Sequence, residues 1–161
     1  MRLFLLKKFD DYPKVKSLRK NAYYAGLLQN LLCGEEGVVI FFLQLKYQKA
    51  ILGDFYPQIS QTISEILEIE TIHHDLLSNA IIMSGGDPML ITSQGKWLVG
   101  RQIDYIKELK QIISYNIEVK EKSVIDFKLA HSKIDNIEIK NLLREMIRDE
   151  EIILKKLKSY A

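Results

Sequence analysis

The stretch Gly85-Gly86-Asp87-Pro88 divides the chain into two helical halves. A glycine that ends a helix, followed closely by a proline, is a strong stop signal, because proline cannot continue the helix. Residues 85–100 hold four glycines and one proline, which predicts a long connection, whereas Arg101 to Ala161 contains neither residue. Because a β-sandwich or barrel needs a turn about every 8–12 residues, an all-β fold is close to excluded.

Two further breaks complete the helical pattern, at Gly53-Asp54-Phe55-Tyr56-Pro57 and at Asp135-Asn136. The spacing predicts four helices, over residues 17–52, 57–84, 101–131 and 137–158. Two hairpins of long helices joined by a long crossover are similar to the ferritin-like class of four-helix bundles. We therefore expect an all-α fold, and the length of 161 residues suits a single domain over residues 1–161.

Charge and hydropathy exclude several classes of protein. The 23 basic and 21 acidic residues give a net charge of only +2, so no nucleic-acid partner is expected. The apolar run Leu3–Leu6 is shorter than the ~7–15 residues of a signal peptide, and Gly37–Leu45 is shorter than the ~20 of a membrane span. The single cysteine fits a reducing compartment. We expect a cytoplasmic protein that does not span a membrane.

The second predicted helix carries two polar residues in its apolar stripe. The 3–4 spacing between Ile66 and Leu77 requires inward positions near residues 70 and 73. Glu70 and His73 occupy these positions. Because they are three residues apart, the carboxylate and the imidazole lie on one face of the helix, and that face is expected to point inward.

Each of the other three predicted helices also places a glutamate in a gap of its apolar stripe: these residues are Glu35, Glu121 and Glu150. No basic residue is expected at the inward positions in these gaps. Asp149 and Glu151, on either side of Glu150, are expected to face solvent. The pattern predicts four carboxylates and one imidazole in the core of the bundle.

Such a cluster of buried carboxylates requires a partner of opposite charge. An ionised carboxylate removed from water costs several kcal/mol unless it is paired or bound to a metal ion. Carboxylates together with imidazole suit iron, manganese or zinc better than calcium. The sequence therefore predicts a metal site with one or two ions, formed by residues Glu35, Glu70, His73, Glu121 and Glu150.

Five short motifs resemble the ferritin-like superfamily, and most closely its rubrerythrin and manganese-catalase-like proteins. They are Leu32-Cys33-Gly34-Glu35, Glu70-x-x-His73, Ser84-Gly85-Gly86-Asp87-Pro88, Glu121-Lys122-Ser123-Val124-Ile125 and Arg148-Asp149-Glu150-Glu151. The resemblance implies a four-helix bundle with a dinuclear iron or manganese site, in a dimer or larger homo-oligomer. It also implies peroxide reduction, peroxide disproportionation or ferrous oxidation as the activity.

Two positions depart from this pattern. The second Glu-x-x-His motif of the family would begin at Glu150, but residue 153 is isoleucine. In the first helix, either Glu35 or the adjacent Glu36 can be the inward residue. An alternative alignment with the family pattern, anchored at Tyr47, places Val38 at the ligand position. If the first-helix ligand and the histidine at position 153 are both missing, four ligands remain: Glu70, His73, Glu121 and Glu150. Four ligands are enough for one metal ion and poor for two.

Two functions follow from these observations. The first is a metal-dependent oxidoreductase, catalase-like or ferroxidase-like, that uses peroxide or dioxygen. The chain has no Cys-x-x-Cys pair for a rubredoxin-type electron-transfer centre, so peroxide disproportionation or metal oxidation is favoured over peroxide reduction. The second is a ferritin-like bundle without a working metal site that serves as a structural or interaction protein, and Ile153 supports it.

Overall fold

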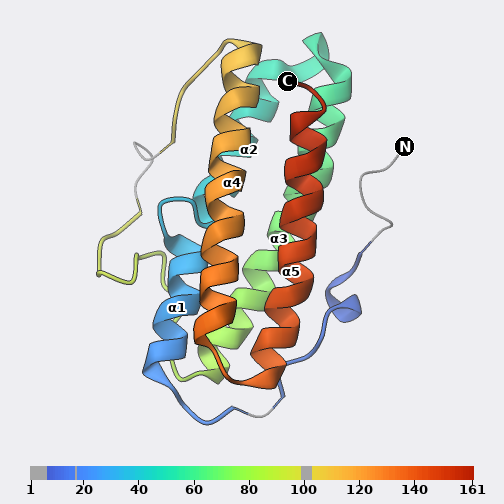
Figure 1. Cartoon of the computed structure of the whole chain (residues 1–161). Helices are drawn as coiled ribbons and strands as arrows, with labels where there is room; N and C mark the ends of the chain where they lie inside the picture. The colour runs from blue at the N-terminus through green and yellow to red at the C-terminus, as the bar shows by residue number, and fades with distance from the viewer. Residues whose placement is uncertain (1–6, 17, 99–102) are drawn as a thin grey trace.

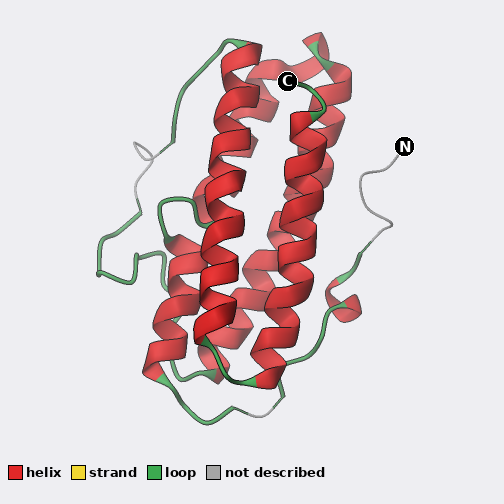
Figure 2. Cartoon of the chain, viewed as in Figure 1, coloured by secondary structure: helices red, strands yellow, loops and turns green. Residues whose placement is uncertain are grey.

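The computed structural model describes residues 7–16, 18–98 and 103–161, and they form a helical bundle (Figures 1 and 2). Its elements are η1 (Phe9–Asp11), α1 (Ala22–Cys33), α2 (Val38–Leu52), η2 (Gly53–Phe55), α3 (Pro57–Met83), α4 (Leu109–Lys133) and α5 (Ile137–Lys158). Within the described ranges the only β contact is an isolated bridge between Ile91 and Trp97. The prediction of an all-α fold is confirmed.

The helices form two hairpins that pack on each other. Both α1 and α2 contact α3, and α4 packs along α5. The described parts of the connection from α3 to α4, residues 84–98 and 103–108, run along the outside of the bundle, as Figure 1 shows. Residues 103–108 are not helical, so α4 begins at Leu109 and not near residue 101 as predicted. The fourth predicted helix matches α5 at both ends.

The prediction of one continuous helix over residues 17–52 is wrong. Asn21 caps α1 by accepting a hydrogen bond from the backbone N–H of Tyr24, and the helix ends at Cys33. The turn that follows depends on Gly37, where a Cβ would lie 2.8 Å from the carbonyl oxygen of Leu32. Only glycine fits this close approach, so Gly37 permits the tight turn that separates α1 from α2. The two helices together take the place of one long helix of the bundle.

The core consists of two apolar clusters. One cluster includes Leu28, Leu77, Phe127 and Met146, and the other includes Leu45, Ile66, Ile112 and Ile153. On α3, α4 and α5 the residues of the first cluster are separated along the helix from those of the second by buried polar residues. A polar layer therefore crosses the middle of the bundle.

Among the described residues, the segment Ala22–Phe55 is long and apolar enough to cross a membrane, with a mean hydropathy of 1.4. It comprises α1, α2 and η2, and 56% of its most apolar stretch is buried inside the bundle. A core helix of a bundle meets the same criterion, so this segment carries no argument for a membrane location.

Candidate metal centre

Five ionisable side chains from three helices meet in the middle of the bundle. Glu70 and His73 come from α3, Lys120 from α4, and Asp149 and Glu150 from α5. Lys120 is 1% exposed and the other four are fully buried. Charged groups are rarely buried this completely unless they are paired, so their contacts decide what the cluster can do.

Lys120 joins the two glutamates. Its Nζ atom donates hydrogen bonds to Oε1 of Glu70 at 2.5 Å and to Oε2 of Glu150 at 2.7 Å. The hydroxyl of Ser123 donates to the same Oε2 atom of Glu150 at 2.9 Å. The ammonium group also lies 4.2 Å from the ring centroid of Phe41 on α2, a cation–π contact. Lys120 therefore has partners on α2, α3 and α5.

His73 lies between the two acidic residues of α5. Its Nε2 atom is 3.1 Å from Oδ2 of Asp149, and its Nδ1 atom is 3.3 Å from Oε1 of Glu150. Residues from the N-terminal segment hold Asp149 in turn. The hydroxyl of Tyr12 donates to Oδ2 of Asp149 at 2.6 Å, and Nζ of Lys7 donates to Oδ1 at 2.5 Å. The N-terminal segment thus covers this side of the cluster.

The environment shifts the pKa values of the lysine and the two glutamates. Burial and the negative charge of Glu150 raise the pKa of Glu70 despite the opposing effect of Lys120. Burial acts in the same direction on Glu150, but Lys120 and His73 outweigh it and lower the pKa of Glu150 to about 2. Burial alone would lower the pKa of Lys120, but the two glutamates raise it. Lys120 and Glu150 therefore form a charged pair.

The second pair is His73 and Asp149. Burial would lower the pKa of His73, but the contacts with Asp149 and Glu150 raise it to about 9. Burial would raise the pKa of Asp149, but His73, Lys7 and Tyr12 lower it. With His73 protonated, three carboxylates face three cations, His73, Lys120 and Lys7.

Three possible ligand atoms of this cluster make no well-aligned hydrogen bond among the described residues: Oε2 of Glu70, Nδ1 of His73 and Oε1 of Glu150. The last two face each other at 3.3 Å as an ion pair. The three residues offer ligand atoms that lie within 4.8 Å of one another. Donors about 2.0–2.2 Å from one shared ion are separated by up to about 4.4 Å, so a small shift brings them together. Because Asp149 holds Nε2 of His73, Nδ1 is the nitrogen left for a ligand bond.

This donor set fits one transition-metal ion. Two carboxylate oxygens and one imidazole nitrogen suit manganese, iron or zinc. Within the described part of the chain a second ion lacks a comparable set, because Lys120 already takes the other oxygens of Glu70 and Glu150. Ile153, where the dinuclear pattern has a histidine, is fully buried in the apolar core.

The structure brings together Glu70, His73 and Glu150 from the predicted ligand set, and their role as ligands stays a prediction. The predicted inward position of Glu121 is wrong. Its side chain is 48% exposed and pairs with Lys158 at 2.6 Å. The adjacent Lys120, about 100° further round the helix, points into the bundle instead.

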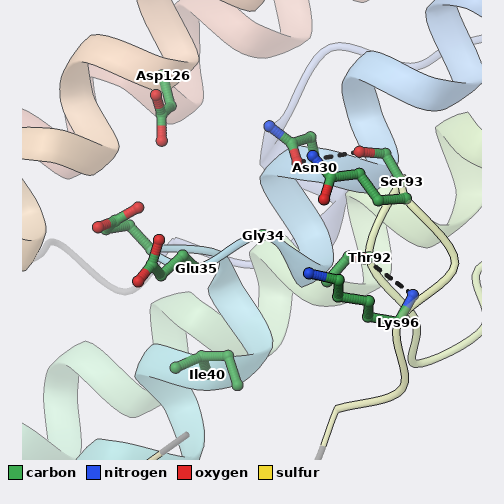
Figure 3. Close-up of a pocket in the computed structure, with 10 residues that line it drawn as sticks. Asn30, Gly34, Glu35, Ile40, Thr92, Ser93, Lys96 and Asp126 are labelled. Atoms are coloured by element: carbon green, nitrogen blue, oxygen red, sulfur yellow. Dashed lines mark hydrogen bonds between the residues drawn. The ribbon is translucent and has the colours of Figure 1, made fainter.

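The predicted inward position of Glu35 is also wrong, because residue 35 lies in the turn between α1 and α2 and is exposed. Glu35 lines a surface cavity of about 590 Å³ (Figure 3). Glu36 from the same turn and Asp126 from α4 line it too, and burial raises the pKa of both carboxyl groups. Val38, the alternative, is buried at the first turn of α2 and supplies no ligand atom.

Sequence reasoning missed two members of the cluster, Lys120 and Asp149, and also Tyr12, which donates to Asp149. Asp149 was expected to face solvent, but it is fully buried because the N-terminal segment packs over it. For Lys120 a signal existed, since residues 113, 117, 120, 124 and 127 follow the inward spacing as well as a stripe through Glu121 does. A basic residue in a gap between glutamates is also their simplest partner.

Comparison with known structures identifies the class of fold. KatB, a manganese catalase from Anabaena PCC7120, superposes with a TM-score of 0.82 at 14% identity, over 92% of this chain and 74% of KatB. A second structure, of wild-type KatB, gives a TM-score of 0.83 at 15% identity over 91% and 74% of the two chains. No protein-family model and no curated protein matches the sequence. The chain has the ferritin-like four-helix bundle fold of the manganese catalases.

Proposed function

We propose that this chain is a ferritin-like protein that binds a single transition-metal ion, manganese or iron, through Glu70, His73 and Glu150. The observation that carries the proposal is that three buried residues bring possible ligand atoms within 4.8 Å of one another, with Oε2 of Glu70 lacking a hydrogen-bond partner among the described residues. Buried polar atoms without partners are rare in proteins, and a bound ion is one of the ordinary explanations.

The surrounding residues support this role. Asp149 accepts from Nε2 of His73, which directs Nδ1 of His73 toward the two glutamates. Lys120 and Ser123 hold Oε2 of Glu150, which leaves Oε1 facing Nδ1 of His73 at 3.3 Å. Partners of this kind orient metal ligands and raise the affinity of the site for the ion.

We propose peroxide as the small molecule on which the site acts. The support is the fold shared with KatB, a manganese catalase. When bound, a manganese or iron ion would supply the redox change and the open coordination position that a small oxidant requires. Lys120, beside both glutamates, would contribute a fixed positive charge and hydrogen-bond donors.

One observation favours a second function, a metal-free bundle that serves a structural or interaction role. The three carboxylates of the cluster already face three cations when His73 is protonated. A cluster with balanced charge needs no metal ion to be buried. The two functions therefore differ in whether the purified protein contains metal.

The test is the metal content of protein produced in medium supplemented with manganese and iron. We expect about one equivalent of metal in the wild type and a loss of at least tenfold in Glu70→Gln and in His73→Ala. Glu121→Gln is the matched control, because it makes the same chemical change at an exposed position, and it is expected to keep the metal. Wild-type protein without manganese, iron or zinc would contradict the proposal and favour the metal-free bundle.

Oxygen release from peroxide then tests the chemistry separately. We expect manganese-loaded wild type and Glu121→Gln to release oxygen, and Glu70→Gln to release none above the buffer rate. A metal-loaded wild type that releases no oxygen would refute the peroxide proposal and leave the metal site intact.

A further inference from the structure

We propose that the ammonium group of Lys120 takes the place of one of the two cations of a dinuclear site, so that Lys120 and one metal ion share the carboxylates of Glu70 and Glu150. This inference deepens the proposed function, on which its one-ion part rests. It assigns to a side chain of the protein the charge that a second ion would carry.

The hydrogen bonds of the two glutamates show the sharing directly. Each carboxylate accepts a hydrogen bond from Lys120 through one oxygen, Oε1 of Glu70 and Oε2 of Glu150. The other oxygen of Glu70 has no hydrogen-bond partner among the described residues, and the other oxygen of Glu150 faces Nδ1 of His73 at 3.3 Å. An ion bound to the oxygens that Lys120 uses would lie about 2.0–2.2 Å from them. Nζ of Lys120 already lies 2.5 and 2.7 Å from these oxygens, so the ammonium and such an ion exclude each other.

The surroundings of Lys120 suit an ammonium group better than a metal ion. Phe41 of α2 presents its ring at 4.2 Å from Nζ, which stabilises a cation and offers no ligand atom. Ser123 donates its hydrogen to Glu150 and supplies no negative charge. One turn beyond Glu150, Ile153 is also without a ligand atom. Phe41, Ser123 and Ile153 thus present apolar or neutral groups at positions where a second metal ion would need anionic ligands.

The charges of the cluster point the same way. With His73 neutral, one divalent ion, Lys120 and Lys7 carry four positive charges in total. The three carboxylates carry three negative charges, so the net charge is +1. Two divalent ions beside both lysines would leave a surplus of three positive charges around carboxylates that are fully buried. An uncompensated buried charge costs several kcal/mol, so the lysine and a second ion are alternatives.

The experiment converts Lys120 into a ligand. In Lys120→Glu the cation is replaced by a third carboxylate, and we expect the variant to hold about one equivalent more manganese than the wild type. The control is Lys122→Glu, the same change at an exposed position two residues along α4, which is expected to match the wild type in metal content. Equal or lower metal content in folded Lys120→Glu would overturn the inference.

Lys120→Glu adds a negative charge to the core, so its folding is tested by refolding with manganese and with chelator. A second variant, Lys120→Gln, removes the charge and adds none. We expect manganese to raise the melting temperature of Lys120→Gln by about 5 °C more than that of the wild type, because an ion then replaces the lost cation. If Lys120→Glu does not fold with manganese, and manganese stabilises Lys120→Gln no more than the wild type, the inference is wrong.

The outcomes separate this inference from the proposed function. Metal-free wild type would refute the proposed function, but metal bound by Lys120→Glu and absent from the wild type would still support the exchange of lysine for an ion. Conversely, one equivalent in both proteins would support the proposed function and refute the exchange.

Discussion

Nε2 of His73 lies 3.1 Å from Oδ2 of Asp149, and both side chains are fully buried. This contact determines which nitrogen of the imidazole faces the glutamates, because the nitrogen bound to Asp149 is not free to bind anything else. It joins the N-terminal segment to the centre of the bundle, since Tyr12 and Lys7 bind the same carboxylate.

Asp149→Asn is expected to weaken metal binding by about 10–100-fold, because the amide no longer holds His73 with a negative charge. Titration of metal-free protein with manganese measures the change. Glu151→Gln is the control: it alters the adjacent, exposed carboxylate that pairs with Lys128. An Asp149→Asn protein with the manganese affinity of the wild type would show that the contact does not position the ligand.

Tyr12→Phe is expected to lower the free energy of unfolding by about 1–2 kcal/mol, because a hydrogen bond to a buried carboxylate is lost. Urea denaturation of the metal-free protein measures this effect. Tyr23→Phe changes a tyrosine that is 57% exposed and is expected to stay within about 0.5 kcal/mol of the wild type. Equal stability of the two variants would mean that the Tyr12 hydroxyl does not hold the N-terminal segment.

Ile153→His restores the residue that the dinuclear pattern has at this position, yet it is expected to destabilise the protein by at least about 2 kcal/mol. The imidazole would be buried in an apolar cluster, and Lys120 would still take the oxygens that a second ion needs. Thermal unfolding and metal analysis test both parts. Ile152→His, at a residue 41% exposed, is the control. A second equivalent of metal in Ile153→His would contradict the role given to Lys120.

Cys33 is expected to react slowly with thiol reagents in the folded protein. Burial raises the pKa of its thiol to about 11, so little thiolate forms at neutral pH. The pKa of Cys33 is higher in the folded protein than in the unfolded chain. The contribution of the protonated thiol to the free energy of unfolding is therefore complete below the ordinary thiol pKa, and it is lost as the pH rises toward 11. Alkylation rates from pH 7 to 10, in native and in urea-unfolded protein, measure the difference. Equal rates would show an accessible thiol.

Gly26→Ala and Gly37→Ala are expected to change stability in opposite directions. Gly26 lies within α1, and a Cβ there meets nothing within 4 Å, so alanine stabilises the helix by about 0.5–1 kcal/mol. At Gly37 a Cβ would lie 2.7 Å from the backbone nitrogen of Gly34, so alanine destabilises by at least about 1 kcal/mol. Chemical denaturation of both variants measures this, and a neutral Gly37→Ala would remove the reason given for the break between α1 and α2.

The sequence by itself determined the helical class, the two hairpins and the long connection between them. These features depend on local chemistry: Pro57 begins α3, and Gly85, with φ of 86°, follows its end. The inward positions of Glu70, His73 and Glu150 also followed from periodicity, because apolar residues on both sides of each one restrict the phase of the helix.

Only the tertiary structure decided which of two adjacent charged residues faces the core. Lys120 and Glu121 differ by one step of about 100°, and either phase fits the apolar residues of α4. Lys120 is inward because Glu70 and Glu150, from two other helices, provide the partners that a buried ammonium requires. Those partners are 50 and 30 residues away along the chain, so no local pattern contains them. The sequence thus predicted a cluster of buried carboxylates, and the packing of the helices decided that its built-in cation is a lysine.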